Sequence, residues 1–194
     1  MTRTEWHILK EADDAIRAAV AGVPADGWHL RTPCDAWDVT QVLQHTIGDQ
    51  AAYTSKITGG AGPSYDPFDP SGTLDGDPSA PLEAALAGSA DAFGSVDPSD
   101  TAVPVPIPPF ELPAELAVHA AALDLVIHAW DIAVATGGPS PLTPSLARAL
   151  RPVADALAEP LRGFAFGPAI EPAPGADAAA SLLNHLGRRA DWKA

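Results

Sequence analysis

Apolar residues recur at helical spacing along most of the chain, and this pattern predicts an all-α protein. In residues 4–23 the apolar side chains fall mostly on one helical face, and Gly22 and Pro24 close the predicted helix. The next helix is predicted over residues 38–57, where Asp38 and Gln41 have the spacing of a capping box. Further helices are predicted over residues 80–94, 113–137, 143–158 and 177–187.

Proline and glycine divide these helices from one another. Pro113 and Pro144 fall in predicted first turns, where a missing N–H group is tolerated. Residues 59–79 are so rich in Gly, Pro, Asp and Ser that they predict a long surface loop, a candidate lid. In residues 103–108, two valines and an isoleucine alternate with proline, which allows only an extended edge segment. The pattern therefore predicts a helical bundle with long loops. Residues 162–175 are also predicted to be irregular.

The chain length fits one domain over residues 1–194, with a bundle core over residues 1–140 and a C-terminal extension over residues 141–194. A single cysteine excludes an internal disulfide, and residues 1–10 lack the apolar stretch of a signal peptide, so we expect a cytoplasmic protein. No run of about 18 apolar residues escapes a charge, which argues against a membrane span. The net charge of −14 argues against nucleic acid and anionic membranes as partners. Composition does not indicate an oligomeric state.

Three polar residues interrupt the apolar stretch LDLVIHAWDIAVATG, residues 123–137. At about 100° of rotation per residue, Asp124 and His128 lie within about 40° of each other, and Asp131 lies about 60° to the other side. Burying such groups is costly unless something binds them. Asp124 and His128 are therefore candidate metal ligands, with a third ligand from elsewhere in the chain.

His45 is the best-placed third ligand, because it lies in a predicted helix beside Val42 and Leu43 and must border the core. In helical bundles, one helix commonly gives a pair of ligands and a facing helix gives a single one. Two imidazoles and a carboxylate suit Zn²⁺ with an open position, and equally suit Fe²⁺, Ni²⁺ or Mn²⁺. The alternative is that each histidine is a hydrogen-bonded core residue.

The other candidate groups have simpler interpretations. His119 lies about 180° from His128 around the same helix and should face away from the site. Asp131 could support a ligand histidine from behind, or it could pair with an arginine such as Arg148. Cys34 lies beside acidic residues, which favours a packing thiol over a reactive one. His7, His29 and His185 lie near helix ends, where a solvated or locally bonded ring is expected.

Several stretches resemble a known family. The stretches TPCDAWDVTQVLQHTIG (residues 32–48) and DLVIHAWDIAVATG (residues 124–137) resemble the signature stretches of the DinB-like metal-binding superfamily. The resemblance is to its branch related to the N-terminal domain of mycothiol-dependent maleylpyruvate isomerase. FGPAIEP and SLLNHLGRRADW, near the end of the chain, resemble the tail of uncharacterised, actinobacterial-type members of that branch.

The resemblance implies a four-helix bundle with a divalent metal, usually zinc, on His45, Asp124 and His128. The isomerase has glutamate where this chain has Asp124, which is one methylene shorter. It also has a separate C-terminal domain for which the residues after Gly137 are too few, so we do not expect maleylpyruvate isomerase activity itself. The resemblance implies instead a metal-dependent transferase or isomerase-type enzyme that uses a low-molecular-weight thiol, such as mycothiol, and an electrophilic substrate. The alternative is a non-catalytic, metal-stabilised bundle that acts as a binding or scaffold protein.

Overall fold

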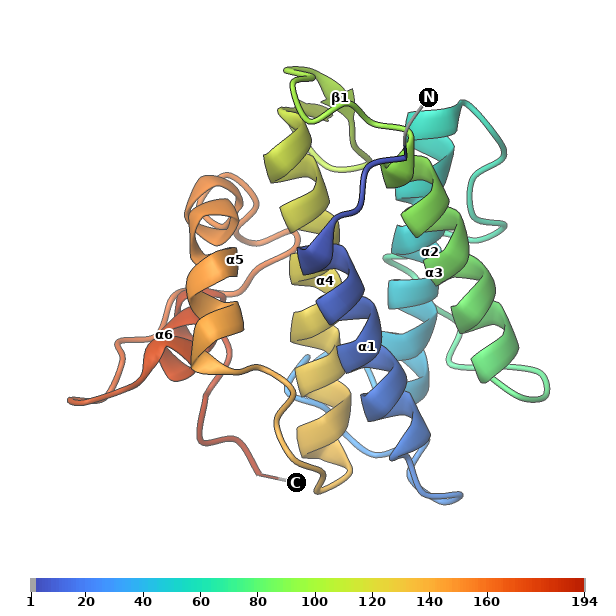
Figure 1. Ribbon diagram of the computed structural model, residues 1–194. Helices are drawn as coiled ribbons and strands as arrows, with labels where there is room; N and C mark the ends of the chain where they lie inside the picture. The colour runs from blue at the N-terminus through green and yellow to red at the C-terminus, as the bar shows by residue number, and fades with distance from the viewer. Residues whose placement is uncertain (1–2, 194) are drawn as a thin grey trace.

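The computed structural model describes residues 3–193, and its first four long helices form a bundle (Figure 1). They are α1 (His7–Ala21), α2 (Val39–Thr58), α3 (Ser79–Gly94) and α4 (Ala114–Ala135). Helix α1 packs along α4, α3 packs along α2, and α2 also contacts α4. An antiparallel hairpin of β1 (Val103–Pro104) and β2 (Glu111–Leu112) lies between α3 and α4 in the chain. The prediction of an all-α bundle is confirmed.

Two further helices lie together on one side of this bundle, next to α4 (Figure 1). They are α5 (Pro144–Leu157) and α6 (Ala178–His185), and they pack on each other while α5 also contacts α4. Their boundaries lie within a residue or two of the predicted ones. Between them, residues 158–177 are irregular, as the sequence predicts for most of this segment. The extension therefore covers part of the surface of the bundle's central helix.

Helix α4 is the centre of the core, because nearly all of its faces are buried. By length and composition it could also cross a membrane, yet 83% of its most apolar window is buried inside the structure. A helix that is apolar all round is expected at the centre of a bundle. Against this background the few polar residues of α4, among them Asp124, His128 and Asp131, stand out.

Side-chain capping marks where α2 and α5 begin. The Asp38 side chain accepts a hydrogen bond from the Gln41 backbone, and the Gln41 side chain accepts one from the Asp38 backbone, which confirms the predicted capping box. Thr143 caps α5, with Pro144 as its first residue. The sequence pattern predicts Pro113 in the first turn of α4. It lies instead at the N-cap, one residue before the helix begins.

The loop over residues 59–78 is anchored to α2 by the buried side chain of Gln44. The Gln44 amide oxygen accepts a hydrogen bond from the Gly72 backbone at 2.7 Å, and its amide nitrogen donates to the Thr73 carbonyl at 2.6 Å. The Tyr65 hydroxyl donates to the Gln44 carbonyl at 2.7 Å. Rather than a free lid, the loop is a strap along α2, and it brings residues 67 and 68 next to His45.

Gly48 allows this close approach of the loop. A Cβ atom at Gly48 would lie 2.9 Å from Pro67 Cγ, which is closer than a side chain can normally come. The absence of a side chain on this face of α2 therefore lets Pro67 lie over the helix next to His45.

Candidate metal centre

His45 projects from the middle of α2 and is only 5% exposed. Its Nδ1 lies 2.8 Å from the carbonyl oxygen of Pro67. A carbonyl can only accept, so Nδ1 carries the proton and donates. The ring also packs against Trp37, with 4.6 Å between ring centroids, and edge-on to Phe68 at 5.1 Å. In the neutral ring, Nε2 is thus left with a free lone pair on the opposite side.

His128 has the same arrangement on α4. Its Nδ1 lies 3.0 Å from Oδ2 of Asp131, and that carboxylate also accepts hydrogen bonds from Nε and Nη2 of Arg188. Although burial raises the pKa of Asp131, the charge of Arg188 and the bonds from both partners hold it below its ordinary value. The ionised Asp131 therefore fixes the Nδ1–H tautomer of His128, as outer partners of metal-bound imidazoles commonly do.

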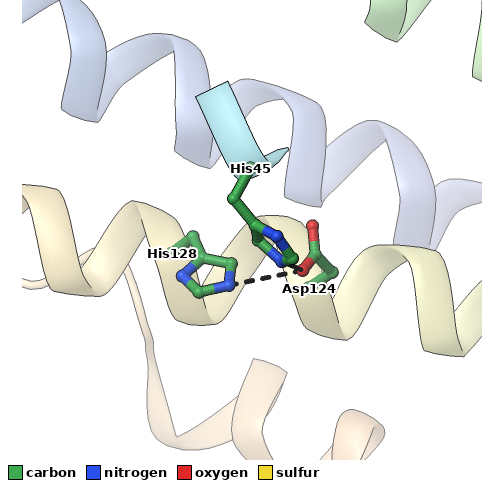
Figure 2. A group of neighbouring side chains, drawn as sticks. All are labelled: His45, Asp124 and His128. Atoms are coloured by element: carbon green, nitrogen blue, oxygen red, sulfur yellow. Dashed lines mark ion pairs between the residues drawn. The ribbon is translucent and has the colours of Figure 1, made fainter. Parts of the chain in front are cut away.

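The three candidate ligands converge between α2 and α4 (Figure 2). His45 Nε2 lies 3.3 Å from Asp124 Oδ1, and His128 Nε2 lies 3.4 Å from the same oxygen. One ligand atom from each residue falls within 4.8 Å of the others. Asp124 is one turn before His128 on α4, so the helical phase predicted from the sequence brings both to the same side.

The donor set fits a divalent metal ion. The second oxygen of Asp124, Oδ2, is buried and finds no hydrogen-bond partner within residues 3–193. A buried carboxylate oxygen without a partner is costly, and a cation would compensate it. The donors are two imidazole Nε2 atoms, whose rings are held by hydrogen bonds at Nδ1, and one carboxylate. Such a set is found in Zn²⁺, Fe²⁺, Ni²⁺ and Mn²⁺ sites.

Without an ion, protons serve the same electrostatic purpose. Burial lowers the pKa of His45, but the hydrogen bond to Asp124 and the charge of that carboxylate outweigh it and raise the value to about 9. Burial raises the pKa of Asp124, but the charge of His128 and the bond from His45 hold it below its ordinary value. A metal ion bound between His45 and Asp124 would replace the proton of this imidazolium and release it.

A cavity of about 460 Å³ lies beside the three candidate ligands, and all three line it. This volume falls in the range of small-molecule sites. Helix α2 adds Asp49, one turn after His45, and burial followed by the charge of Asp124 raises the pKa of Asp49 to about 7. Asp49 is not among the residues predicted from the sequence, although its spacing of four residues from His45 places it on the same face of α2.

Residues of the C-terminal extension also line this cavity. Leu157, Leu161, Phe164 and Phe166 line it, together with Phe68 of the loop strapped to α2. Phe164 and Phe166 could not be predicted as lining residues from the sequence, because an irregular segment has no periodicity that indicates which side chains face inward. Arg188 also lines the cavity, and it is the arginine that pairs with Asp131, in place of the predicted Arg148.

The remaining histidines and the cysteine lie outside the ligand cluster. His119 Nδ1 donates to the carbonyl of Glu115, 2.6 Å away on its own helix. Exposed His29 lies 3.1 Å from Asp38. Cys34 lines the cavity, but burial and the charge of Asp131 raise the pKa of its thiol to about 11, so it stays protonated near neutral pH. This agrees with the prediction of a packing thiol.

Comparison with known proteins identifies the family. The family model described as the mycothiol maleylpyruvate isomerase N-terminal domain matches residues 9–133. The chain belongs to this family. The matched range contains His45, Asp124 and His128, whereas helices α5 and α6 lie beyond it.

Two similar curated proteins are uncharacterised proteins of Mycobacterium tuberculosis. One comes from strain CDC 1551 / Oshkosh and another from strain ATCC 25618 / H37Rv. Each is 30% identical to this chain over 151 residues, which is 78% of either sequence. No solved structure matches the chain. The comparisons thus establish that the chain belongs to the mycothiol maleylpyruvate isomerase N-terminal domain family. They do not indicate an activity, because these relatives are uncharacterised.

Proposed function

We propose that the protein binds one divalent metal ion on His45, Asp124 and His128 and uses it in a thiol-dependent transferase or isomerase-type reaction. The observation that carries this proposal is the convergence of three donors, one with an uncompensated buried oxygen, on the wall of a ligand-sized cavity. Zinc is the first candidate, and Ni²⁺, Fe²⁺ and Mn²⁺ suit the same donors. Family membership supports a low-molecular-weight thiol, such as mycothiol, as the co-substrate.

The residues around the site would prepare it for such a reaction. Pro67 and Asp131 fix the two imidazoles through their Nδ1 atoms, so both Nε2 atoms point at Asp124. Trp37 packs against both histidine rings and shields them from water. A bound divalent cation would lower the pKa of a thiol or water beside it. The cavity on that side leaves space for the thiol and for an electrophile.

A non-catalytic role is the second candidate, because the donors come from two different helices. An ion held by α2 and α4 would cross-link the centre of the bundle, and its binding energy would add to the folding energy. This candidate predicts a large loss of thermal stability on chelation and no thiol-dependent turnover.

A thiol-conjugation screen separates the two candidates. The purified protein is loaded with zinc and assayed with mycothiol and with glutathione against a panel of electrophiles, with and without a chelator. The enzyme proposal predicts conversion that needs both the metal and the thiol and that is lost in His128→Ala but kept in His119→Ala. Turnover absent with every electrophile, together with a strong loss of stability on chelation, would support the metal-stabilised bundle instead.

A further inference from the structure

We propose that the wall built by Phe68 and the C-terminal extension is a subsite for an uncharged, apolar ring of the substrate. This inference rests on the proposed function, because it places the electrophile of that reaction. The wall consists of five apolar side chains facing one cavity: Phe68, Leu157, Leu161, Phe164 and Phe166.

The aromatic side chains of the wall form a continuous path from the candidate metal ligands to solvent. The rings of His45 and Phe68 lie 5.1 Å apart edge-on, and those of Phe68 and Phe164 lie 4.7 Å apart with a tilt of 35°. Aromatic rings at these separations provide favourable surfaces for another ring. A flat apolar group seated against Phe68 and Phe164 would thus extend toward the candidate ligands.

Phe164 supplies independent support for a ligand at this wall. It is 60% exposed, whereas large apolar side chains of this fold are mostly buried. Phe164 lines the cavity, so a ligand that fills the cavity would cover part of it. Covering an exposed phenylalanine gains the free energy of burying apolar area.

The charges of the lining favour an uncharged ligand over a carboxylate. The guanidinium of Arg188 is matched by Asp131, which accepts bonds from Nε and Nη2. The acidic residues that line the cavity are Asp49 and Asp124, and a divalent ion would balance two negative charges. The lining therefore offers no unmatched side-chain cation to an anionic substrate, and a buried charge without a partner is costly.

The wall also lies in a different part of the chain from the candidate ligands. Apart from Phe68, its residues follow residue 133, where the family match ends, while all three metal-ligand candidates precede it. The extension thus supplies most of the wall that would contact the electrophile, while the family domain supplies the candidate metal ligands.

Binding of two matched probes tests the subsite without any turnover. Calorimetry with the whole chain, in metal-free and zinc-loaded forms, measures the affinity for 1-naphthol and for naphthalene-1-sulfonate. The two probes have the same rings, but the second carries a negatively charged sulfonate group, which is a poor zinc ligand. We expect 1-naphthol to bind at least about tenfold more tightly in both forms. Equal or tighter binding of the sulfonate, or no binding of 1-naphthol at millimolar concentration, would overturn the proposal.

Variants locate the bound ring. Phe164→Ala and Phe68→Ala should each weaken 1-naphthol binding about three- to tenfold, the usual value of an aromatic contact. Phe110→Ala is the matched control, because Phe110 is similarly exposed, at 56%, but does not line the cavity. Because Phe164 is exposed, its alanine variant should fold like the wild type, and circular dichroism checks this. A loss in the control as large as in Phe164→Ala would refute the placement.

The outcome separates this inference from the function on which it rests. If zinc fails to bind but 1-naphthol binds as expected, the metal-dependent function is wrong and the cavity still takes an apolar ring. If zinc binds to the three ligands but 1-naphthol binds no more tightly than naphthalene-1-sulfonate, the proposed subsite is wrong, while the proposed metal centre still stands.

Discussion

Arg188 reaches across 57 residues of sequence to hold Asp131, with its Nε 3.0 Å from Oδ1 and its Nη2 2.8 Å from Oδ2. Both side chains are buried, and the same carboxylate accepts the Nδ1–H of His128. The C-terminal segment is thereby tied directly to the support of a candidate metal ligand. Stability and metal affinity should both respond when this pair is broken.

Removing the cation of the pair should destabilise the whole protein. Arg188→Met leaves the Asp131 carboxylate buried without its partner, and we expect the free energy of unfolding to fall by about 3–5 kcal/mol. Urea unfolding measures this. The control is Arg189→Met, which removes an exposed partner of Asp191 and should cost less than about 0.5 kcal/mol. Equal losses in the two variants would show that the buried pair carries no special weight.

Asp131→Asn should weaken metal binding while leaving the three ligands in place. The amide oxygen of asparagine can still accept the Nδ1–H of His128, but it lacks the negative charge of the carboxylate, and weakening of such a supporting group typically costs about 10- to 100-fold in metal affinity. Competition with a chromogenic zinc chelator measures the change. Asp35→Asn, an exposed change near the start of α2, is the control and should leave the affinity unaltered. Wild-type affinity in Asp131→Asn would contradict the supporting role.

Asp13 on α1 should make stability depend on pH. Burial raises its pKa from 3.8 to about 7, although the charge of Arg17 opposes this, and its Oδ1 has no partner within the described residues. The folded chain keeps a proton that the unfolded chain loses above 3.8, so this group's contribution to stability falls as pH rises from 3.8 through 7.

Asp13→Asn should therefore stabilise the protein at pH 8, by about 1–3 kcal/mol, and have little effect at pH 4. Asp14→Asn is the control, because neighbouring Asp14 is exposed and its pKa is lowered by the hydrogen bond to Lys10. It should give no gain at pH 8. Chemical unfolding at both pH values tests this, and a pH-independent gain in Asp13→Asn would contradict the assignment.

Gln44 should determine how firmly the loop over residues 59–78 is held. Gln44→Ala removes the side-chain bonds to Gly72 and Thr73, so the loop should open more often and be cleaved faster by chymotrypsin after Tyr65 or Phe68. Limited proteolysis followed by mass spectrometry measures the rate. Lys56→Ala, on the same helix, should be cleaved at the wild-type rate. Unchanged cleavage of Gln44→Ala would show that other contacts hold the loop.

The sequence predicts those features that local chemistry determines. The capping box of Asp38 and Gln41 marks the start of α2, and helical phase brings Asp124 and His128 to one side of α4 while it turns His119 away. These predictions need only neighbouring residues. The identity of His45 as the third member of the cluster followed from its apolar surroundings in a predicted helix.

Features that depend on distant parts of the chain could not be obtained in this way. Nothing in the spacing of α4 indicates that Asp131 meets Arg188 rather than Arg148, because the contact depends on how the extension folds back. The anchoring of the loop by Gln44 and the approach of Phe164 to Phe68 are likewise tertiary contacts of irregular segments. Such segments have no periodicity from which a partner can be inferred.

Metal content is the most direct test of the candidate centre. Elemental analysis of the purified protein, after loading with zinc and removal of excess ion, should give about one ion per chain. His45→Ala and His128→Ala should each lose most of this ion, whereas His119→Ala, a matched change on α4 outside the cluster, should keep it. Unchanged metal content in both His45→Ala and His128→Ala would contradict the assignment of the site.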